Sequence, residues 1–138
     1  MLLVGPDHTD GQLQRLAHQM GLDDAIVFAG WRRDIGAMLS SADIAVASSI
    51  REGFGLNLIE AMYMGLPVVA TDNRGHRMII RDGENGYLVQ VGESGKMASR
   101  ILELAENPEL RERFARSDVS RFGADIVSEQ LVGILETI

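Results

Sequence analysis

The sequence predicts an α/β fold built on a doubly wound, mostly parallel sheet of the Rossmann type. Short apolar segments rich in Val, Ile and Ala alternate with segments whose apolar residues recur at helical spacing. Strands that alternate with helices of about ten residues form βαβ units, so parallel strands with helices on both faces of the sheet are expected. The 138 residues suit one domain that buries most of its apolar surface.

Five short apolar segments are the predicted strands. They span residues 1–4, 25–30, 43–49, 67–72 and 86–91. The loops that begin at Gly30, Ser48 and Thr71 follow three of these strands. Because ligands bind at the carboxyl ends of the strands in doubly wound sheets, we expect the functional residues in these loops.

Helical spacing and cap residues predict the helices. Gly21 is expected to end the first helix, and Asp34 to cap the second. Asn107 followed by Pro108 indicates a helix that starts at Pro108. The predicted helices span residues 10–22, 34–42, 94–107, 107–117 and 124–138, and a further helix runs from about Leu56 to a stop at Gly65 and Pro67.

The composition argues against several classes of protein. A net charge of −7 is unfavourable for a general nucleic-acid binder, because phosphate binding needs a basic stripe and the sequence has none. The absence of cysteine excludes disulfides and thiolate metal sites, and fits a reducing compartment. The apolar runs are too short to cross a bilayer, and the apolar start breaks at Gly5 and Pro6, so no signal peptide is expected.

The stretch REGFGLNLIE at residues 51–60 places Glu52 in the loop after a predicted strand and Glu60 about one turn into the next helix. Gly53 and Gly55 let the backbone turn sharply and approach a ligand without a Cβ in the way. The amide N–H groups at the helix start then form a ready site for a phosphate or diphosphate. These amides belong to Phe54, Gly55, Leu56 and Asn57.

The two carboxylates flank this anion site. Four residues of helix rise about 6 Å, so Glu60 can reach one end of a ligand whose phosphates rest on the helix start, and Glu52 the other. Ionised carboxylates accept hydrogen bonds only, so hydroxyl-rich groups such as ribose and hexose are their natural partners.

Three other interpretations of these residues stay open. A Gly-x-Gly turn before a helix is common, and a glutamate in a core helix is often its solvated edge. A dinucleotide site is the second interpretation, although Leu58 stands where its third glycine belongs. A glycosidase carboxylate pair is the third, although it needs a proton donor and a glutamate beside free helix N–H groups stays ionised.

The segment EGFGLNLIE resembles the Glu-x7-Glu motif of the retaining GT-B glycosyltransferases, the family known as glycosyl transferases group 1. The similarity extends in register from VGPD near the start to NGYLV, and is most specific over residues 43–89. RGHR, expected as a loop at residues 74–77, is most similar to the branch that makes capsular polysaccharides and exopolysaccharides. The resemblance implies that residues 1–138 are the C-terminal, nucleotide-sugar-binding domain of a GT-B fold, with a helical part over residues 94–138.

The resemblance also implies a role for each matching residue. Glu52 is the expected catalytic residue and approaches hydroxyls of the donor sugar, whereas Glu60 binds the ribose hydroxyls. The other donor-binding residues of the motif are Gly53, Phe54, Gly55 and Leu56, whose backbone holds the sugar and diphosphate.

Two residues outside the motif match the segment that recognises the base in the family. These are Trp31 and Arg32 in GWRRD, which act largely through main-chain groups. An equally good interpretation of Trp31 is a surface aromatic that covers a strand end. Arg32 and Arg33 are equally well explained as a solvated pair.

The implied reaction transfers a sugar, with retention, from a nucleotide-diphosphate sugar to an acceptor hydroxyl in polysaccharide biosynthesis. The donor is expected to be a UDP-sugar, and neither a metal nor another cofactor is expected, which agrees with the lack of an Asp/His cluster in the sequence. The acceptor, a glycan or a lipid-linked sugar, is expected to bind an N-terminal domain that this chain lacks. The full-length protein is expected in the cytoplasm, at the inner face of the membrane, and the isolated chain is expected to be inactive.

The resemblance places the start of the chain at the second strand of the domain, so the central first strand, with the Arg and Lys that the family carries near it, is expected to be missing. The sheet is then expected to pair directly across the gap or through a second chain. An exposed sheet edge or the helix over residues 124–138 is expected to promote a homo-oligomer. Two alternative functions are a stand-alone sugar-nucleotide binding module and a GT-B-fold sugar-nucleotide epimerase.

Overall fold

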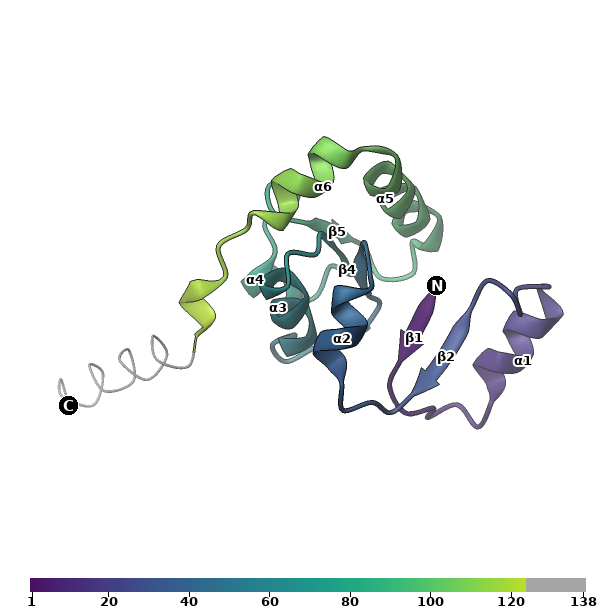
Figure 1. The fold of residues 1–138 in the computed structure, drawn as a ribbon. Coiled ribbons are helices and arrows are strands. Elements are labelled where there is room, and N and C mark those ends of the chain that lie inside the picture. Colours follow the sequence, from purple (N-terminus) through teal and green to yellow (C-terminus); the bar gives the residue numbers. More distant parts are fainter. Residues whose placement is uncertain (124–138) are drawn as a thin grey trace. The chain divides into compact units, whose positions relative to one another are not determined.

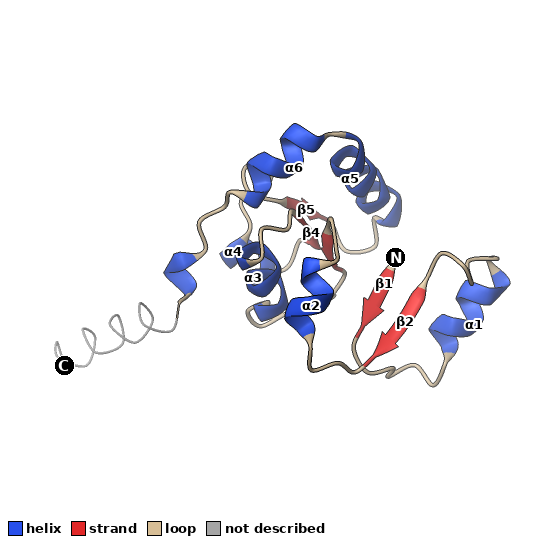
Figure 2. Cartoon of the chain, in the orientation of Figure 1, coloured by secondary structure: helices blue, strands red, loops and turns tan. Residues whose placement is uncertain are grey.

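The structure is a computed structural model that describes residues 1–123 of the 138-residue chain. The chain divides into two compact units, the first over Met1–Ala37 and the second from Met38 onward. Strands and helices alternate along both units (Figures 1 and 2). The helix expected over residues 124–138 lies outside the described residues.

The first unit contains two parallel strands joined by a helix. β1 (Leu2–Val4) pairs with β2 (Val27–Gly30), and α1 (Gln12–Gln19) connects them. α1 ends as the sequence predicts, because Gly21 adopts a φ of 67° and its N–H donates to His18 O over 3.0 Å.

The second unit is built on a three-stranded parallel sheet. Its strands are β3 (Ala45–Ala47), β4 (Val68–Thr71) and β5 (Tyr87–Val89), in the order β3-β4-β5. Its helices are α3 (Leu56–Tyr63), α4 (Arg74–Ile79), α5 (Ser94–Glu106) and α6 (Pro108–Ala115), followed by the 3-10 helix η1 (Ser120–Phe122). α2 (Ile35–Ser40) spans the boundary between the two units.

The central strand β4 is buried along its whole length, and its alternate residues pack into different cores. Val68 and Ala70 belong to the core that includes Leu58 of α3. Val69 belongs to the opposite core, which Leu104 of α5 and Phe114 of α6 fill. Because successive residues of a strand point to opposite faces, helices cover both faces of this sheet (Figure 1), as the sequence predicts.

The parallel α/β fold is therefore confirmed, with its strands in two sheets. β1 and β2 form one sheet, and β3, β4 and β5 form the other. The expected pairing of the sheet halves, directly or through a second chain, stays a prediction.

The prediction of a loop over residues 74–77 is wrong, because these residues begin α4. Asn73 caps this helix: its Oδ1 accepts a hydrogen bond from His76 N over 3.0 Å. The cap residue is visible in the sequence, but a helix of 6 residues is too short for apolar periodicity to reveal it. His76 consequently lies on a helix and is fully buried.

Candidate functional site

The Glu-x7-Glu motif, residues 52–60, runs from the loop after β3 into α3. α3 begins at Leu56, as predicted, and Gly55 before it has a φ of 90°. A Cβ at Gly55 would lie 3.2 Å from Ile79 Cδ1 and 3.3 Å from His76 Cδ2. Both the backbone conformation and the lack of room therefore favour glycine at position 55.

Gly53 has a different environment. A Cβ at Gly53 would meet no atom within 4 Å, and Gly53 is not among the described glycines with a positive φ. The turn itself therefore requires glycine at Gly55 but not at Gly53. The open space beside Gly53 leaves the backbone accessible to a ligand.

The start of α3 presents backbone N–H groups that have no acceptor. The amides of Phe54 and Gly55 donate no hydrogen bond within the part of the chain that the structure describes. The first bond of the helix runs from Leu58 N to Gly55 O over 2.9 Å, so the two amides between these residues have no acceptor inside the helix. Together with the positive end of the helix dipole, these groups can bind an anion such as a diphosphate.

The structure brings both glutamates to this part of α3. Glu52 is half-buried and accepts a hydrogen bond from Gly53 N over 2.9 Å. Glu60 is exposed, and its carboxylate makes no hydrogen bond or ion pair with residues 1–123. Both carboxylates can therefore accept hydrogen bonds from a ligand with hydroxyl groups.

The side chains of Phe54 and Leu56 lie in different environments. The Phe54 ring packs edge-on against Phe122 of η1, with the ring centroids 5.7 Å apart. Leu56 is the first residue of α3, and its side chain is exposed. The resemblance in sequence predicts the same role for both residues, which is to hold the sugar and diphosphate through main-chain groups.

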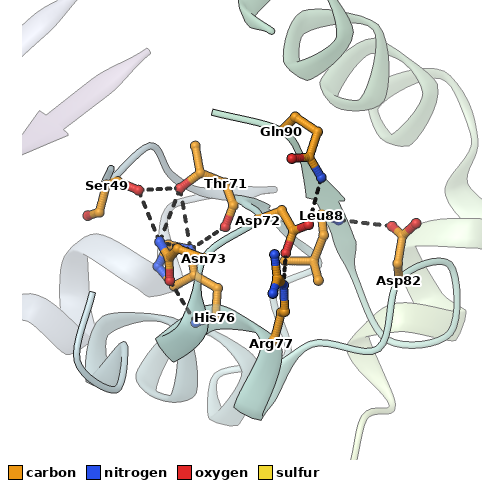
Figure 3. Close-up of polar contacts among 9 residues, drawn as sticks. All are labelled: Ser49, Thr71, Asp72, Asn73, His76, Arg77, Asp82, Leu88 and Gln90. Carbon is orange, nitrogen blue, oxygen red and sulfur yellow. Dashed lines mark hydrogen bonds and ion pairs between the residues drawn. The ribbon is translucent and has the colours of Figure 1, made fainter. Parts of the chain in front are cut away.

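A buried polar cluster next to the motif was not evident in the sequence. Ser49 O, just after β3, accepts hydrogen bonds from Thr71 Oγ1 over 2.5 Å and from Asn73 Nδ2 over 3.0 Å (Figure 3). His76 Nδ1 lies 2.7 Å from Thr71 O. The loops after β3 and β4 are therefore joined at the carboxyl edge of the sheet, where the sequence places functional residues. The cap residue Asn73 was the one local signal for this cluster.

Asp72 links α4 to the segment after β5. Arg77 Nε donates to Asp72 Oδ1, and Gln90 Nε2 donates to Asp72 Oδ2 over 2.6 Å (Figure 3). These bonds, that from Arg77 above all, lower the pKa of Asp72. The carboxylate therefore stays ionised and holds Arg77 in place.

Trp31 and Arg32 lie in the first unit, directly after β2. Trp31 is 65% exposed, and the Arg33 guanidinium lies 5.2 Å from the centroid of its ring. Arg32 donates two hydrogen bonds to Asp34, of 2.8 and 2.6 Å, which lower the pKa of that carboxyl. With its guanidinium engaged, Arg32 has its main-chain groups left for a ligand.

A hollow of about 370 Å³ opens at the carboxyl ends of β1 and β2, beside Gly30. Asp7 lines this hollow and shapes the loop before α1. Its carboxylate accepts hydrogen bonds from the Thr9 side chain and from Thr9 N and Gly11 N, at 2.6, 2.8 and 2.7 Å. These bonds, with that of the Thr9 hydroxyl first, lower the pKa of Asp7. The sequence did not single out this loop.

Residues 1–123 lack two further kinds of feature. No group of three or more His, Asp or Glu side chains there is placed to hold a metal ion. None of the helices in this part of the chain is both long and apolar enough to cross a membrane.

The chain is similar to known glycosyltransferases. The model of the family described as "Glycosyl transferases group 1" matches residues 1–118, which include the whole motif. The chain is 40% identical, over 97% of its length, to EpsD of Bacillus subtilis (strain 168), which is named as a glycosyltransferase. It is 38% identical, over 100% of its length, to phosphatidyl-myo-inositol mannosyltransferase of Mycobacterium leprae (strain TN). The chain spans 36% and 38% of these two proteins, less than two fifths of either.

The fold is similar to that of HepE (Alr3699) from Anabaena. The structure of HepE in complex with UDP matches with a TM-score of 0.87 and 29% identity, over 99% of this chain and 40% of HepE. The structure of HepE in complex with UDP-glucose matches with a TM-score of 0.84 and 28% identity, over the same shares of 99% and 40%. The structural neighbours are GT-B glycosyltransferases with Rossmann-like domains.

Proposed function

The chain belongs to the glycosyl transferases group 1 family, and we propose that it is the nucleotide-sugar-binding domain of a GT-B enzyme that transfers a sugar, with retention, to an acceptor hydroxyl. The observation that carries this proposal is the start of α3, where free backbone amides lie between Glu52 and Glu60 in the sequence. The proposed donor is a UDP-sugar, because HepE has been solved with UDP and with UDP-glucose.

Each residue of the site has a proposed role in binding the donor. The amides after the glycine turn hold the diphosphate. Glu60 accepts hydrogen bonds from the ribose hydroxyls, and Glu52 accepts them from the donor sugar beside its reacting carbon. Trp31 and Arg32 bind the base through main-chain groups, in keeping with the engagement of the Arg32 guanidinium by Asp34.

The proposed reaction breaks the bond from the anomeric carbon to the diphosphate and forms a bond to the acceptor oxygen. Negative charge grows on the leaving diphosphate as this bond breaks. N–H donors that are already in place stabilise such charge without reorganisation. The amides of Phe54 and Gly55 supply such donors, since the turn fixes them. We propose that these groups serve without a metal or another cofactor.

The proposed acceptor is a glycan or a lipid-linked sugar in polysaccharide biosynthesis, bound by an N-terminal domain. The length of the relatives supports this division, because the chain spans less than two fifths of them. We propose that the chain by itself binds the donor but has little or no transferase activity. The whole protein is proposed to act in the cytoplasm, at the inner face of the membrane.

Calorimetric titration of the 138-residue chain tests the donor-binding proposal. We expect binding of UDP and of at least one of UDP-glucose and UDP-N-acetylglucosamine, and GDP-sugars serve as the control for the base. The absence of binding to any of these compounds would contradict the proposal.

A second experiment distinguishes the enzyme from a stand-alone binding module. The N-terminal domain of a relative is added in trans, and transfer of a labelled sugar to an acceptor is measured. Recovered transfer supports the enzyme. Donor binding without any recovered transfer favours the binding module.

A further inference from the structure

All three buried polar side chains that the structure describes gather beside the Glu-x7-Glu motif. They are Thr71, Asn73 and His76, with exposed fractions of 5%, 8% and 0%. Burial of a polar group is costly unless the group is hydrogen-bonded. Thr71 and Asn73 bond to each other, and all three side chains bond to backbone carbonyls around them (Figure 3). Such a cluster keeps the surrounding backbone in one arrangement.

The cluster first holds the start of the loop that carries Glu52. This loop spans residues 48–55, between β3 and α3. Near its start, Ser49 O accepts hydrogen bonds from both Thr71 and Asn73. The two side chains thus fix the point at which the loop leaves the sheet.

His76 then contacts the far end of the same loop. A Cβ at Gly55 would lie 3.3 Å from His76 Cδ2 and 3.7 Å from Glu52 Cγ. One edge of the ring, at Nδ1, therefore lies against Thr71 O at the end of β4. The opposite edge, at Cδ2, lies against the turn at Gly55, in the loop that carries Glu52.

The hydrogen bonds of the ring indicate which nitrogen carries the proton. Nδ1 lies 2.7 Å from Thr71 O, which can only accept, and 3.1 Å from Asn73 Nδ2, which can only donate; the shorter contact assigns the proton to Nδ1. Nε2 is then an acceptor, and it is buried without a hydrogen-bond partner in the described chain. An unpaired buried acceptor lowers stability. The bond from Nδ1 to Thr71 O and the contact of the ring with the turn are therefore the interactions that favour histidine here.

We propose that His76 is a positioning residue for Glu52. Its ring spans the space from the end of β4 to the turn at Gly55 and so determines where the Glu52 carboxylate stands. His76 acts through the loop and does not touch the donor. This inference rests on the proposed role of Glu52 toward the donor sugar. It follows that the loss of His76 should weaken binding of the UDP-sugar more than binding of UDP.

The variant His76→Asn tests this proposal in the 138-residue chain. The Asn amide lies as many bonds from Cα as Nδ1 does, so it can keep the bond to Thr71 O while the edge that contacts the turn is lost. We expect about tenfold weaker binding of the UDP-sugar, which is about 1.4 kcal/mol, and a smaller loss for UDP alone. His18→Asn is the matched control, because the exposed His18 ring binds Asp23 in the first unit. Equal losses for UDP and the UDP-sugar would overturn the proposal.

A double-mutant cycle shows whether His76 acts through Glu52. We expect His76→Asn to have no further effect on UDP-sugar binding once Glu52 has been replaced by Gln. Additive losses in the double variant would overturn the proposal. If His76→Asn does not fold, His76→Gln replaces it in the same cycle, because its longer side chain fills more of the space of the ring.

Amide hydrogen exchange tests the positioning without any ligand. We expect the amides of Leu58 and Ile59, which donate to Gly55 O at the turn, to exchange about tenfold faster in His76→Asn than in the wild type, with the amides of α5 unchanged. Unchanged exchange at Leu58 and Ile59 would overturn the proposal. If the wild-type chain binds no nucleotide sugar, the proposed function fails, and the exchange measurement still decides whether His76 holds the loop.

Discussion

Gly75 lies so close to Glu52 that a Cβ at position 75 would stand 2.6 Å from the Glu52 carbonyl oxygen. Backbone and Cβ atoms do not pack at that distance, so only glycine allows the first turn of α4 to lie directly against the loop that carries Glu52. α4 thus supports Glu52 from its backbone side.

Replacement of Gly75 by Ala is expected to displace Glu52. The Cβ must push the Glu52 backbone away, at a cost of about 1–3 kcal/mol in the free energy of unfolding. Urea unfolding measures this loss, and calorimetry measures the weaker binding of a UDP-sugar that should accompany it. Gly95→Ala is the matched control, because a Cβ at Gly95 of α5 would meet no atom within 4 Å. Equal stabilities of the two variants would contradict the close packing of Gly75.

Replacement of the two glutamates by glutamine is expected to separate their roles. Glu60→Gln should weaken UDP and a UDP-sugar alike, because both carry the ribose. Glu52→Gln should weaken the UDP-sugar more than UDP. Hydrogen bonds to charged groups contribute about 1.5–3 kcal/mol, so the affinities should fall by about tenfold or more. Calorimetry with both ligands measures this, with Glu106→Gln at the exposed end of α5 as the control. Equal losses for both ligands in both variants would refute the assignment.

The parts of the site that follow from local sequence could be predicted, and the parts made by distant residues could not. The apolar run of β4 and the glycine turn before Leu56 are local patterns, and both appear in the structure where the sequence places them. Gly75 and Glu52 are in contact although they lie 23 positions apart in the sequence, and such a contact produces no periodic pattern of residues. The bond from Asn73 to Ser49 joins residues 24 apart. The same physical reason explains the missed helix, since α4 is defined by its cap and by packing more than by periodicity.

Two asparagines cap helices in the second unit, and their replacement by alanine should have different consequences. Asn107 accepts a hydrogen bond from Leu110 N over 3.0 Å at the start of α6, so Asn107→Ala should cost about 1 kcal/mol of stability. Asn73 caps α4 and also donates to Ser49 O, so Asn73→Ala should cost more. Only Asn73→Ala should also weaken UDP-sugar binding. Thermal unfolding and calorimetry of both variants measure these effects, and unaltered ligand binding in Asn73→Ala would argue against a role of the cluster in the site.

Asp72 should make the stability of the chain depend on pH. The bonds from Arg77 and Gln90 hold its pKa below the ordinary value of 3.8 in the folded chain. A carboxyl whose pKa is lower in the folded state stabilises the fold fully above the unfolded pKa of about 4. That contribution is lost as the pH falls through the folded pKa, because the unfolded state then binds more protons.

The variant Asp72→Asn should therefore be less stable than the wild type at about pH 6 but should lose less stability on acidification to about pH 3. Urea unfolding midpoints across this range measure both effects. Part of the acid dependence should remain in the variant, because the pKa of Glu103 is also lowered, first by the bond from Arg100 and then by that from Tyr87. Asp24→Asn replaces an exposed aspartate in the first unit and serves as the control. Parallel curves for the wild type and Asp72→Asn would show that the bonds from Arg77 and Gln90 do not contribute to stability.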